Sequence, residues 1–356
     1  MEPNKFHCSY YKENNLSMET TDLFGKKKTK TKKVKQPRED RKVIHETRVK
    51  IDLRKLREIV ISLKEKVDKV GWDRETPAQR SAFHSWNTVS KFAEEWDNGE
   101  DFRIIENVSG GTAGSSARVY YFPSITSYCK PFRECIVPIT EGNKFLFFDL
   151  KAAEFFLNCV FCNETEAIRH YQAGEDIYLY YKSMFPVGLS RDPIKTTLIA
   201  NMYNTSAYRT GINCGISETQ AQRLLDNIAM RIPSMTMKKN SVIRRARELG
   251  YYSCPNGFDQ SDMVKIADID PKKGFNECLA LSVYVQSALG LWMQGFIKKL
   301  EPRINGTILT VFDSCLLEVR PERAEAAKKW IEANIKPFRI GKICEGSNFL
   351  EAYLEA

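Results

Sequence analysis

The chain has 356 residues, 42% of them hydrophobic, which is enough to bury a sizeable core in one large domain or two smaller ones. Ten cysteines without a secretory apolar segment argue for free thiols in a reducing compartment, and no apolar run reaches the roughly 18 residues of a membrane span. The formal net charge is +9, and residues 1–50 hold +7 of it, from 14 Lys or Arg against 7 Asp or Glu. This uneven distribution argues against a protein that coats nucleic acid with a uniformly basic surface. It favours a basic arm attached to a nearly neutral body.

Residues 1–45 form the basic arm, which contains the run KKKTKTKKVKQPREDRK. The run has no apolar periodicity, so we expect the arm to be disordered. Three interpretations remain open: a solvated tail, a nuclear import signal in a eukaryotic setting, or a contact with DNA phosphates. The phosphate contact would involve Lys26, Lys27 and Lys28.

Residues 46–117 are predicted to be a helical region. The run RVKIDLRKLREIVISLKEKVDKV places apolar residues at amphipathic spacing, with Lys and Arg on the opposing face. Such a helix either grips the backbone of a nucleic-acid duplex with its basic face or is an ordinary charged surface helix. The apolar positions are Ile51, Leu53, Leu56, Ile59, Val60 and Leu63.

Two aspartates stand at the ends of apolar runs typical of β-strands. Asp149 ends the run KFLFFD, and Asp313 interrupts ILTVFDSCLLEV. In-line phosphoryl transfer uses two divalent cations about 3.5–4 Å apart, one at the attacking oxygen and one at the leaving oxygen. Hard cations of this kind prefer a few carboxylates together with substrate phosphates. We therefore interpret Asp149 and Asp313 as ligands of two Mg²⁺ ions and as catalytic residues.

A helical run, RDPIKTTLIANMY, lies between the two aspartates. Arg191, Lys195, Ile199 and Tyr203 recur every four residues, so they share one slowly drifting face of a helix. A nucleoside triphosphate would lie along the cationic end, where Arg and Lys neutralise charge on the transferring phosphates, with its base near the tyrosine.

The order of these segments resembles motifs A, B and C of the family A DNA polymerases, the bacterial DNA polymerase I type. DLKAAEFF, RDPIKTTLIANMYN and TVFDSCLLEV occupy the three positions. The family pattern Arg-x3-Lys-x3-Phe-x3-Tyr-Gly is met at Arg191, Lys195 and Tyr203 and is departed from at Ile199 and Asn204. SSARVYYFP and KPFRECIVP before motif A, and VYVQSALGLWM and EGSNFLEAY after motif B, also match segments of the family. The resemblance covers about residues 105–356.

The resemblance implies an α+β right-hand polymerase fold, with an antiparallel palm sheet, helical fingers at about 164–262 and a reduced thumb. The polymerase domain would span 118–356 and extend the 3′-hydroxyl of a DNA primer on its template with dNTPs and Mg²⁺. Glu154 and Tyr203 stand where the family blocks a 2′-hydroxyl, which favours deoxynucleotides. Arg118 and Gln286 stand at minor-groove contacts. We find no Asp-x-Glu run upstream, so a proofreading exonuclease is not expected within the chain.

Several positions depart from the family pattern. Phe312 replaces a histidine and Ser314 a glutamate in motif C, which leaves two aspartates and backbone carbonyls for the metals. Other departures are at Lys151, Phe156, Cys278 and Ser282. Two rival interpretations therefore stay open. One is a non-catalytic nucleic-acid-binding or replisome protein that keeps the polymerase shape, and the other is a single-subunit RNA polymerase or primase.

The segment METTDLFG in the arm resembles a second kind of motif. Its core TTDLF is similar to the bacterial sliding-clamp-binding pentapeptide Gln-x-Asp-Leu-Phe, with Thr20 in place of glutamine. Asp22, Leu23 and Phe24 would contact the clamp, and the alternative is a chance match of five letters. The short chain and its drifted motifs suggest a phage or mobile-element enzyme that works in the cytoplasm of a bacterial host.

Overall fold

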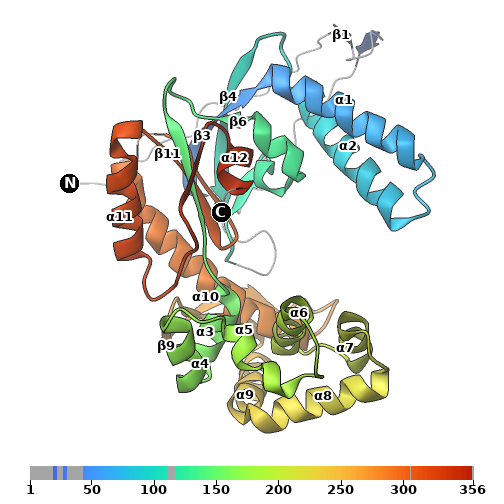
Figure 1. Ribbon diagram of the computed structural model, residues 1–356, viewed down its shortest axis with the longest axis vertical. Helices are drawn as coiled ribbons and strands as arrows, with labels where there is room; N and C mark the ends of the chain where they lie inside the picture. Colours follow the sequence, from blue (N-terminus) through green and yellow to red (C-terminus); the bar gives the residue numbers. More distant parts are fainter. Residues whose placement is uncertain (1–18, 22–26, 30–42, 111–116, 305, 355–356) are drawn as a thin grey trace. The chain divides into compact units, whose positions relative to one another are not determined.

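The computed structural model describes residues 19–21, 27–29, 43–110, 117–304 and 306–354 (Figure 1). The chain divides into two compact units: residues 1–40 with 60–100, and residues 41–59 with 101–356. Most of the basic arm, including Lys26 and the predicted clamp contacts Asp22, Leu23 and Phe24, lies outside the described residues. Within the arm, β1 (Glu19–Thr21) pairs antiparallel with β2 (Lys27–Thr29), which contains Lys27 and Lys28.

The first unit contains a pair of helices joined by a short turn. Helix α1 (Leu53–Val70) enters this unit at Val60, and α2 (Pro77–Trp96) begins with a capping box in which Thr76 and Gln79 satisfy each other's backbone N–H groups. At the turn, Trp72, Phe83 and Trp86 form an aromatic cluster with ring centroids 5.1–6.0 Å apart. Buried residues on both helices form the core: Val60, Leu63, Val67, Val89, Phe92 and Ala93.

The predicted helical region 46–117 is only partly helical. Residues 43–52 form strand β3 (Val43–Asp52) and residues 102–110 form β4 (Phe102–Gly110), so the helical prediction was wrong for these two segments. In the run RVKID, Val49 and Ile51 alternate with charged residues and are fully buried, which is the two-residue period of a strand. Strands β3 and β4 are the centre of an antiparallel sheet of order β5-β4-β3-β6, completed by β5 (Tyr120–Phe122) and β6 (Ile136–Val137).

The second sheet of this unit carries Asp149 and Asp313 and is called the aspartate sheet below. Its antiparallel order is β10-β11-β7-β12, with β10 (Ile308–Val311), β11 (Ser314–Val319), β7 (Lys144–Asp149) and β12 (Cys344–Gly346). All of β11 and residues 145–148 of β7 are buried, as expected for central strands covered on both faces. The predicted strands at the two aspartates are thus confirmed.

The remaining elements of the second unit are mostly helical. Helix α10 (Glu277–Leu300) is buried along most of its length and packs against α3 and α9 and the hairpin β8–β9, and α3 also contacts α6 (Figure 1). The mixture of antiparallel sheets and helices confirms the predicted α+β class. The elements are α3 (Ala153–Phe161), α4 (Thr165–Gln172), α5 (Ile177–Tyr180), α6 (Arg191–Met202), α7 (Ala207–Cys214), α8 (Glu218–Arg231), α9 (Pro233–Leu249), β8 (Tyr251–Asn256), β9 (Asp259–Asp268), α11 (Ala324–Asn334) and α12 (Phe349–Leu354).

Candidate active site

The two predicted aspartates lie side by side at one end of the two central strands of the aspartate sheet. Asp149 is the last residue of β7 and is paired with Ser314, the first residue of β11. The backbone N–H of Leu150 donates to the carbonyl of Asp313 at 3.0 Å, which holds the two segments together just beyond the ladder. Residues 312 and 313 form the turn between β10 and β11, with Phe312 at φ 59°. The geometry therefore places both carboxyl groups at the same end of neighbouring strands.

The electrostatics of the pair favour a bound cation. Burial raises the pKa of Asp149, while the charges of Lys151 and Lys195 oppose that rise. Burial, and secondly the charge of Asp149, raise the pKa of Asp313 to about 7. Two like charges in a partly buried site repel each other, and a divalent cation between them would relieve that cost.

The donor set fits Mg²⁺, which commonly uses one or two carboxylates and completes its shell with water and phosphate oxygens. The described parts of the chain contain no cluster of three or more His, Cys, Asp or Glu side chains suited to a metal. The hydroxyl of Ser314 donates to the carbonyl of Val311 at 2.8 Å and closes the β10–β11 turn, and unlike the glutamate of the family pattern it brings no negative charge to a metal. Asp149 and Asp313 are therefore the side chains in this arrangement that would hold the metal.

Helix α6 presents the predicted triphosphate face. The guanidinium of Arg191 lies 5.3 Å and the ammonium of Lys195 lies 6.0 Å from the ring centre of Tyr178. Arg191 also forms an ion pair with Asp176, whose carboxylate caps α5. The charge of Lys195 lowers the pKa of Asp149, against the larger effect of burial, so the lysine charge reaches this carboxyl group. Arg191 and Lys195 thus both lie beside Tyr178, and the charge of the lysine acts on Asp149.

The C-terminal end of α6 contributes Ile199 and Tyr203. Ile199 is half-buried and packs against the core of the second unit, so it does not supply the aromatic surface that the family pattern has there. Tyr203 is the residue at which α6 ends. Its hydroxyl donates to Glu154 of α3 at 2.7 Å, and burial raises its pKa well above the usual range.

A network joins the residues predicted to contact nucleotide and DNA. Glu154 accepts from Tyr203 with one oxygen and forms an ion pair with Arg118 through the other. The side-chain amide of Gln286 on α10 donates to the Tyr203 hydroxyl at 3.4 Å. The Arg118 guanidinium lies 4.7 Å from the ring centre of Phe312, which is 56% exposed. The network therefore connects α6, α3 and α10 to the turn that carries Asp313.

The sequence did not predict how Arg118 is positioned. Ser287 of α10 accepts the N–H of Ala117 at 3.0 Å, and the Gln294 amide donates to the Ala117 carbonyl at 2.8 Å. Gly290 lies between them on the same helix face, and a Cβ there would be only 2.6 Å from that carbonyl oxygen. The signal for this contact is a line of small and polar residues along an otherwise apolar helix. These residues fix the backbone just before Arg118.

Three of the departures from the family pattern have local explanations. Phe156 is buried in the core and stacks on Tyr171 with ring centroids 4.0 Å apart. Lys151 is exposed two residues after Asp149. Its carbonyl accepts from the Tyr171 hydroxyl at 2.8 Å, and its backbone N–H donates to the carbonyl of Arg339 at 2.8 Å. Ser282 donates to the carbonyl of Leu279 within its own helix at 3.1 Å.

Comparison with known proteins gives a structural match. No model of a protein family matches the sequence, and no curated protein matches it either. The fold is similar to that of the solved POL domain of Pol1 from M. smegmatis in complex with DNA primer-template and dNTP. The TM-score is 0.69 at 15% sequence identity, over 86% of this chain and 68% of that chain. The chain therefore has the fold of a family A DNA polymerase domain, as its motifs predicted. In the described residues, no helix is long and apolar enough to span a membrane.

Proposed function

We propose that the chain is a DNA-templated DNA polymerase, which extends a primer 3′-hydroxyl with dNTPs by two-metal phosphoryl transfer. The observation that carries the proposal is the meeting of Asp149 and Asp313 beside the cationic face of α6, in a fold similar to a POL domain that was solved with primer-template and dNTP. The proposal assigns no exonuclease to these residues. A phage origin and a location in the cytoplasm of a bacterial host stay predictions from the resemblance alone.

The metal site of the proposal consists of Asp149 and Asp313. Two Mg²⁺ ions bound there would supply the charge that activates the primer 3′-hydroxyl and stabilises the leaving pyrophosphate. The carboxylates contribute negative charge at the joined ends of β7 and β11, where the strand ladder fixes their spacing. A rigid set of ligands of this kind limits the reorganisation needed during the reaction.

The other residues bind and select the nucleotide. Arg191 and Lys195 would hold the triphosphate along α6, since both lie near Tyr178 and the charge of the lysine acts on Asp149. Glu154 and Tyr203 would exclude a 2′-hydroxyl, as the resemblance implies, and their hydrogen bond at 2.7 Å supports a shared role.

Arg118 and Gln286 would contact the minor groove of the primer-template, as the resemblance implies. Both are joined to Glu154 and Tyr203, so contact with DNA and choice of sugar would be coupled. A change at either residue should therefore affect both properties.

The two rival functions make different demands on these residues. A replisome scaffold has no physical use for two repelling carboxylates in a partly buried site, because such a pair costs stability unless a cation compensates it. An RNA polymerase or primase must accept a 2′-hydroxyl, whereas Glu154 and Tyr203, which are hydrogen-bonded to each other, stand where the resemblance places the residues that block it. The geometry thus favours a DNA polymerase over both.

Primer extension with dNTPs and NTPs in parallel tests the proposal. The wild type should extend with dNTPs, and Asp313→Asn should lose extension while it binds primer-template normally, because the change removes metal charge from the transition state and no DNA contact. Asp226→Asn, in which the changed carboxylate is exposed on α8, is the matched control and should remain active. Wild-type extension by Asp313→Asn would refute the metal assignment, and a preference for NTPs would support the RNA polymerase rival.

A further inference from the structure

A surface pocket, called the hollow below, lies at the end of β11 that is far from the aspartates. Its volume is about 450 Å³, within the range of roughly 300–1,000 Å³ that is usual for ligand pockets. Strand β11 begins beside Asp149 and ends at Val319, so its six residues separate the hollow from the candidate active site by about 17–20 Å. The hollow is thus distinct from the site proposed for nucleotide transfer.

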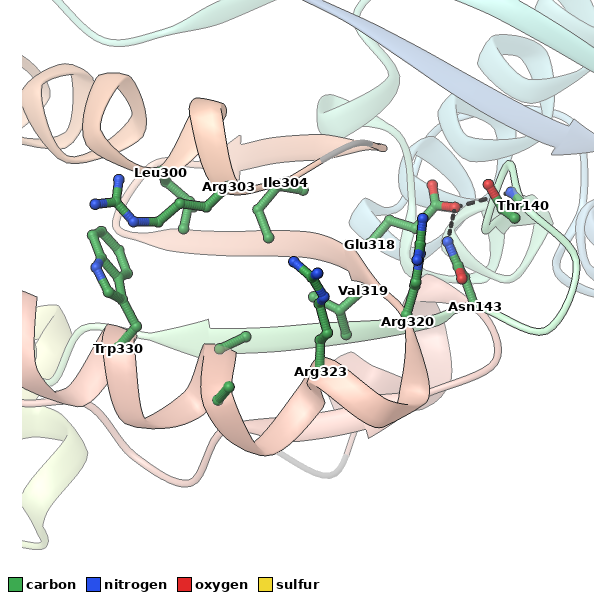
Figure 2. A pocket seen from close by; sticks show the side chains of 12 residues that line it. Thr140, Asn143, Leu300, Arg303, Ile304, Glu318, Val319, Arg320, Arg323 and Trp330 are labelled. Carbon is green, nitrogen blue, oxygen red and sulfur yellow. Dashed lines mark hydrogen bonds between the residues drawn. The ribbon is translucent and has the colours of Figure 1, made fainter.

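The floor of the hollow is apolar and its rim is cationic. Leu300 and Val319 are buried, and Ile304 and Ala327 are half-buried, so the floor offers aliphatic surface. Three exposed arginines surround this floor: Arg303, Arg320 and Arg323. In the view of Figure 2, Arg323 lies between Arg303 with Trp330 on one side and Arg320 with Glu318 on the other. The combination suits a ligand that is apolar at its centre and anionic at its edges.

One carboxylate, that of Glu318, also lines the hollow, and its hydrogen bonds are already made within the fold. It accepts from the N–H groups of Ile139 at 3.1 Å and Thr140 at 2.9 Å, from the amide of Asn143 at 2.9 Å and from the N–H of Thr307 at 3.1 Å. Glu318 is 2% exposed, and four donors spread its charge. Among the described residues, neither Arg320 nor Arg323 has a carboxylate within ion-pair distance. Both guanidinium groups therefore remain available for an anionic ligand.

The aromatic wall of the hollow argues against a nucleic-acid base as the ligand. A base would need the open face of an aromatic ring on which to stack. The Arg303 guanidinium lies 5.0 Å from the ring centre of Trp330, and Phe296 also contacts this indole with ring centroids 5.7 Å apart. The remaining floor is aliphatic. An aliphatic or aromatic side chain of a peptide fits such a floor better than a base does.

We propose that this hollow is a docking site for a short acidic peptide segment of a partner protein. One apolar residue of the segment would fill the floor between Leu300 and Ala327, and flanking Asp or Glu carboxylates would pair with Arg320 and Arg323. Clusters of arginine around a pocket are a recurring means of binding acidic motifs. Because exposed ion pairs contribute little singly, the affinity would depend on the buried apolar residue and the two arginines together.

The test is a binding titration on the full chain with a fluorescein-labelled peptide, Gly-Ser-Asp-Glu-Trp-Leu-Asp-Glu, followed by fluorescence anisotropy. The wild type should bind with a Kd between about 1 μM and 1 mM, and added salt should weaken binding. A peptide with Trp and Leu replaced by Ser, and one with its acids replaced by amides, should each bind at least about tenfold more weakly. These two peptides separate the apolar contribution from the ionic one.

Three variants locate the binding surface. The double variant Arg320→Glu with Arg323→Glu should weaken binding at least about tenfold by charge reversal, and Ala327→Phe should do so by filling the floor without a change of charge. Lys329→Glu, which reverses an exposed charge on α11 outside the hollow, should bind like the wild type. All three should retain primer extension, because none of the changed residues is among the aspartates or on α6. A circular dichroism spectrum like that of the wild type shows that each variant is folded.

Several results would overturn the proposal. No binding by the wild type at a peptide concentration of about 1 mM, or equal binding by the charge-reversal variant, would show that the hollow does not accept acidic peptides. Displacement of the peptide by an eight-residue oligothymidylate at lower concentration, itself abolished in Arg320→Glu with Arg323→Glu, would assign the hollow to single-stranded nucleic acid instead.

Discussion

At the scale of single residues, the hydrogen bond between Glu154 and Tyr203 is the contact to which the proposed function assigns the choice of nucleotide. The two side chains come from α3 and α6, 49 positions apart, and meet at 2.7 Å. The sequence predicted their shared role through the motifs that contain them. It did not predict that Arg118 forms an ion pair with the other oxygen of Glu154, because no local spacing relates residue 118 to residue 154.

Replacement of Glu154 by Ala should increase ribonucleotide incorporation. The change opens space next to Tyr203 and removes a carboxylate that would meet the 2′-hydroxyl. We expect the ratio of kcat/KM for dNTP to that for NTP to fall at least about tenfold, which corresponds to about 1.4 kcal/mol of discrimination. Single-nucleotide incorporation by the wild type and the variant measures both values.

The matched control is Glu154→Gln, which keeps the volume of the side chain and an acceptor for the Tyr203 hydroxyl. It should preserve most of the discrimination if exclusion is steric. An unchanged ratio in Glu154→Ala would show that the sugar does not approach this residue. Equal loss of discrimination in both variants would indicate that the charge, and not the volume, selects the sugar.

At the scale of elements, short apolar patterns predicted the strands beside the two aspartates but not strand β3. The apolar run before Asp149 and the mostly apolar segment 308–319 correctly indicated strands, because a strand covered on both faces has no polar side. Residues 46–52 were misread as part of a helix, since the alternation of Val49 and Ile51 is short and runs directly into the amphipathic pattern of α1. A strand that leads into a helix without a Gly or Pro gives no local boundary signal.

Helix α10 shows an element-scale feature that sequence patterns do not reveal. Its apolar character predicts burial, but the partner of each face depends on the tertiary fold. The close approach of Gly290 to Ala117 is visible only once residues 117 and 290 are brought together. The contact matters because it holds the backbone that precedes Arg118.

Replacement of Gly290 by Ala should reduce activity although alanine favours a helix. The added Cβ would lie 2.6 Å from the carbonyl oxygen of Ala117, so the 117–118 backbone must move and Arg118 with it. We expect kcat/KM for dNTP to fall by about tenfold or more and the thermal midpoint to decrease. Steady-state kinetics and a thermal melt by circular dichroism would measure both effects.

Gly295→Ala is the control for that prediction, because it lies in the same helix with nothing within 4 Å of the added Cβ. It should leave activity unchanged and raise the free energy of unfolding by up to about 1 kcal/mol, the difference in helix propensity. Full activity and stability in Gly290→Ala would mean that the contact between α10 and Ala117 does not position Arg118.

At the scale of the whole molecule, the uneven charge distribution predicts a division of tasks between the arm and the body. Residues 26–38 contain eight Lys or Arg and no acidic residue. Fold class was predictable because the motifs are spread in order over about 105–356. The role of the arm was not, since a cationic run without apolar periodicity is compatible with a solvated tail, an import signal or a phosphate contact.

Replacement of the arm's cations should weaken DNA binding and leave turnover intact. With Lys26, Lys27, Lys28, Lys30, Lys32, Lys33 and Lys35 changed to Gln, the slope of log affinity against log salt should become less steep by about 0.9 for each duplex phosphate that the arm no longer neutralises. Single-nucleotide turnover on saturating primer-template should match the wild type, because the metal and triphosphate residues are unchanged. Anisotropy titrations at several salt concentrations measure the slope, and an unaltered slope would identify the arm as a passive tail.

The clamp motif is the last feature that belongs to the whole molecule, since a tether acts through its partner and not through the active site. If TTDLF binds a bacterial sliding clamp, Leu23→Ala with Phe24→Ala should abolish stimulation of processive synthesis by the loaded clamp, because the two apolar side chains supply most of the buried contact. Synthesis without the clamp and the salt slope of DNA binding should stay at wild-type values, since neither residue is charged. Thr20→Gln, which restores the expected first residue, should strengthen clamp binding. Stimulation that survives the double alanine change would show that the resemblance is a chance match.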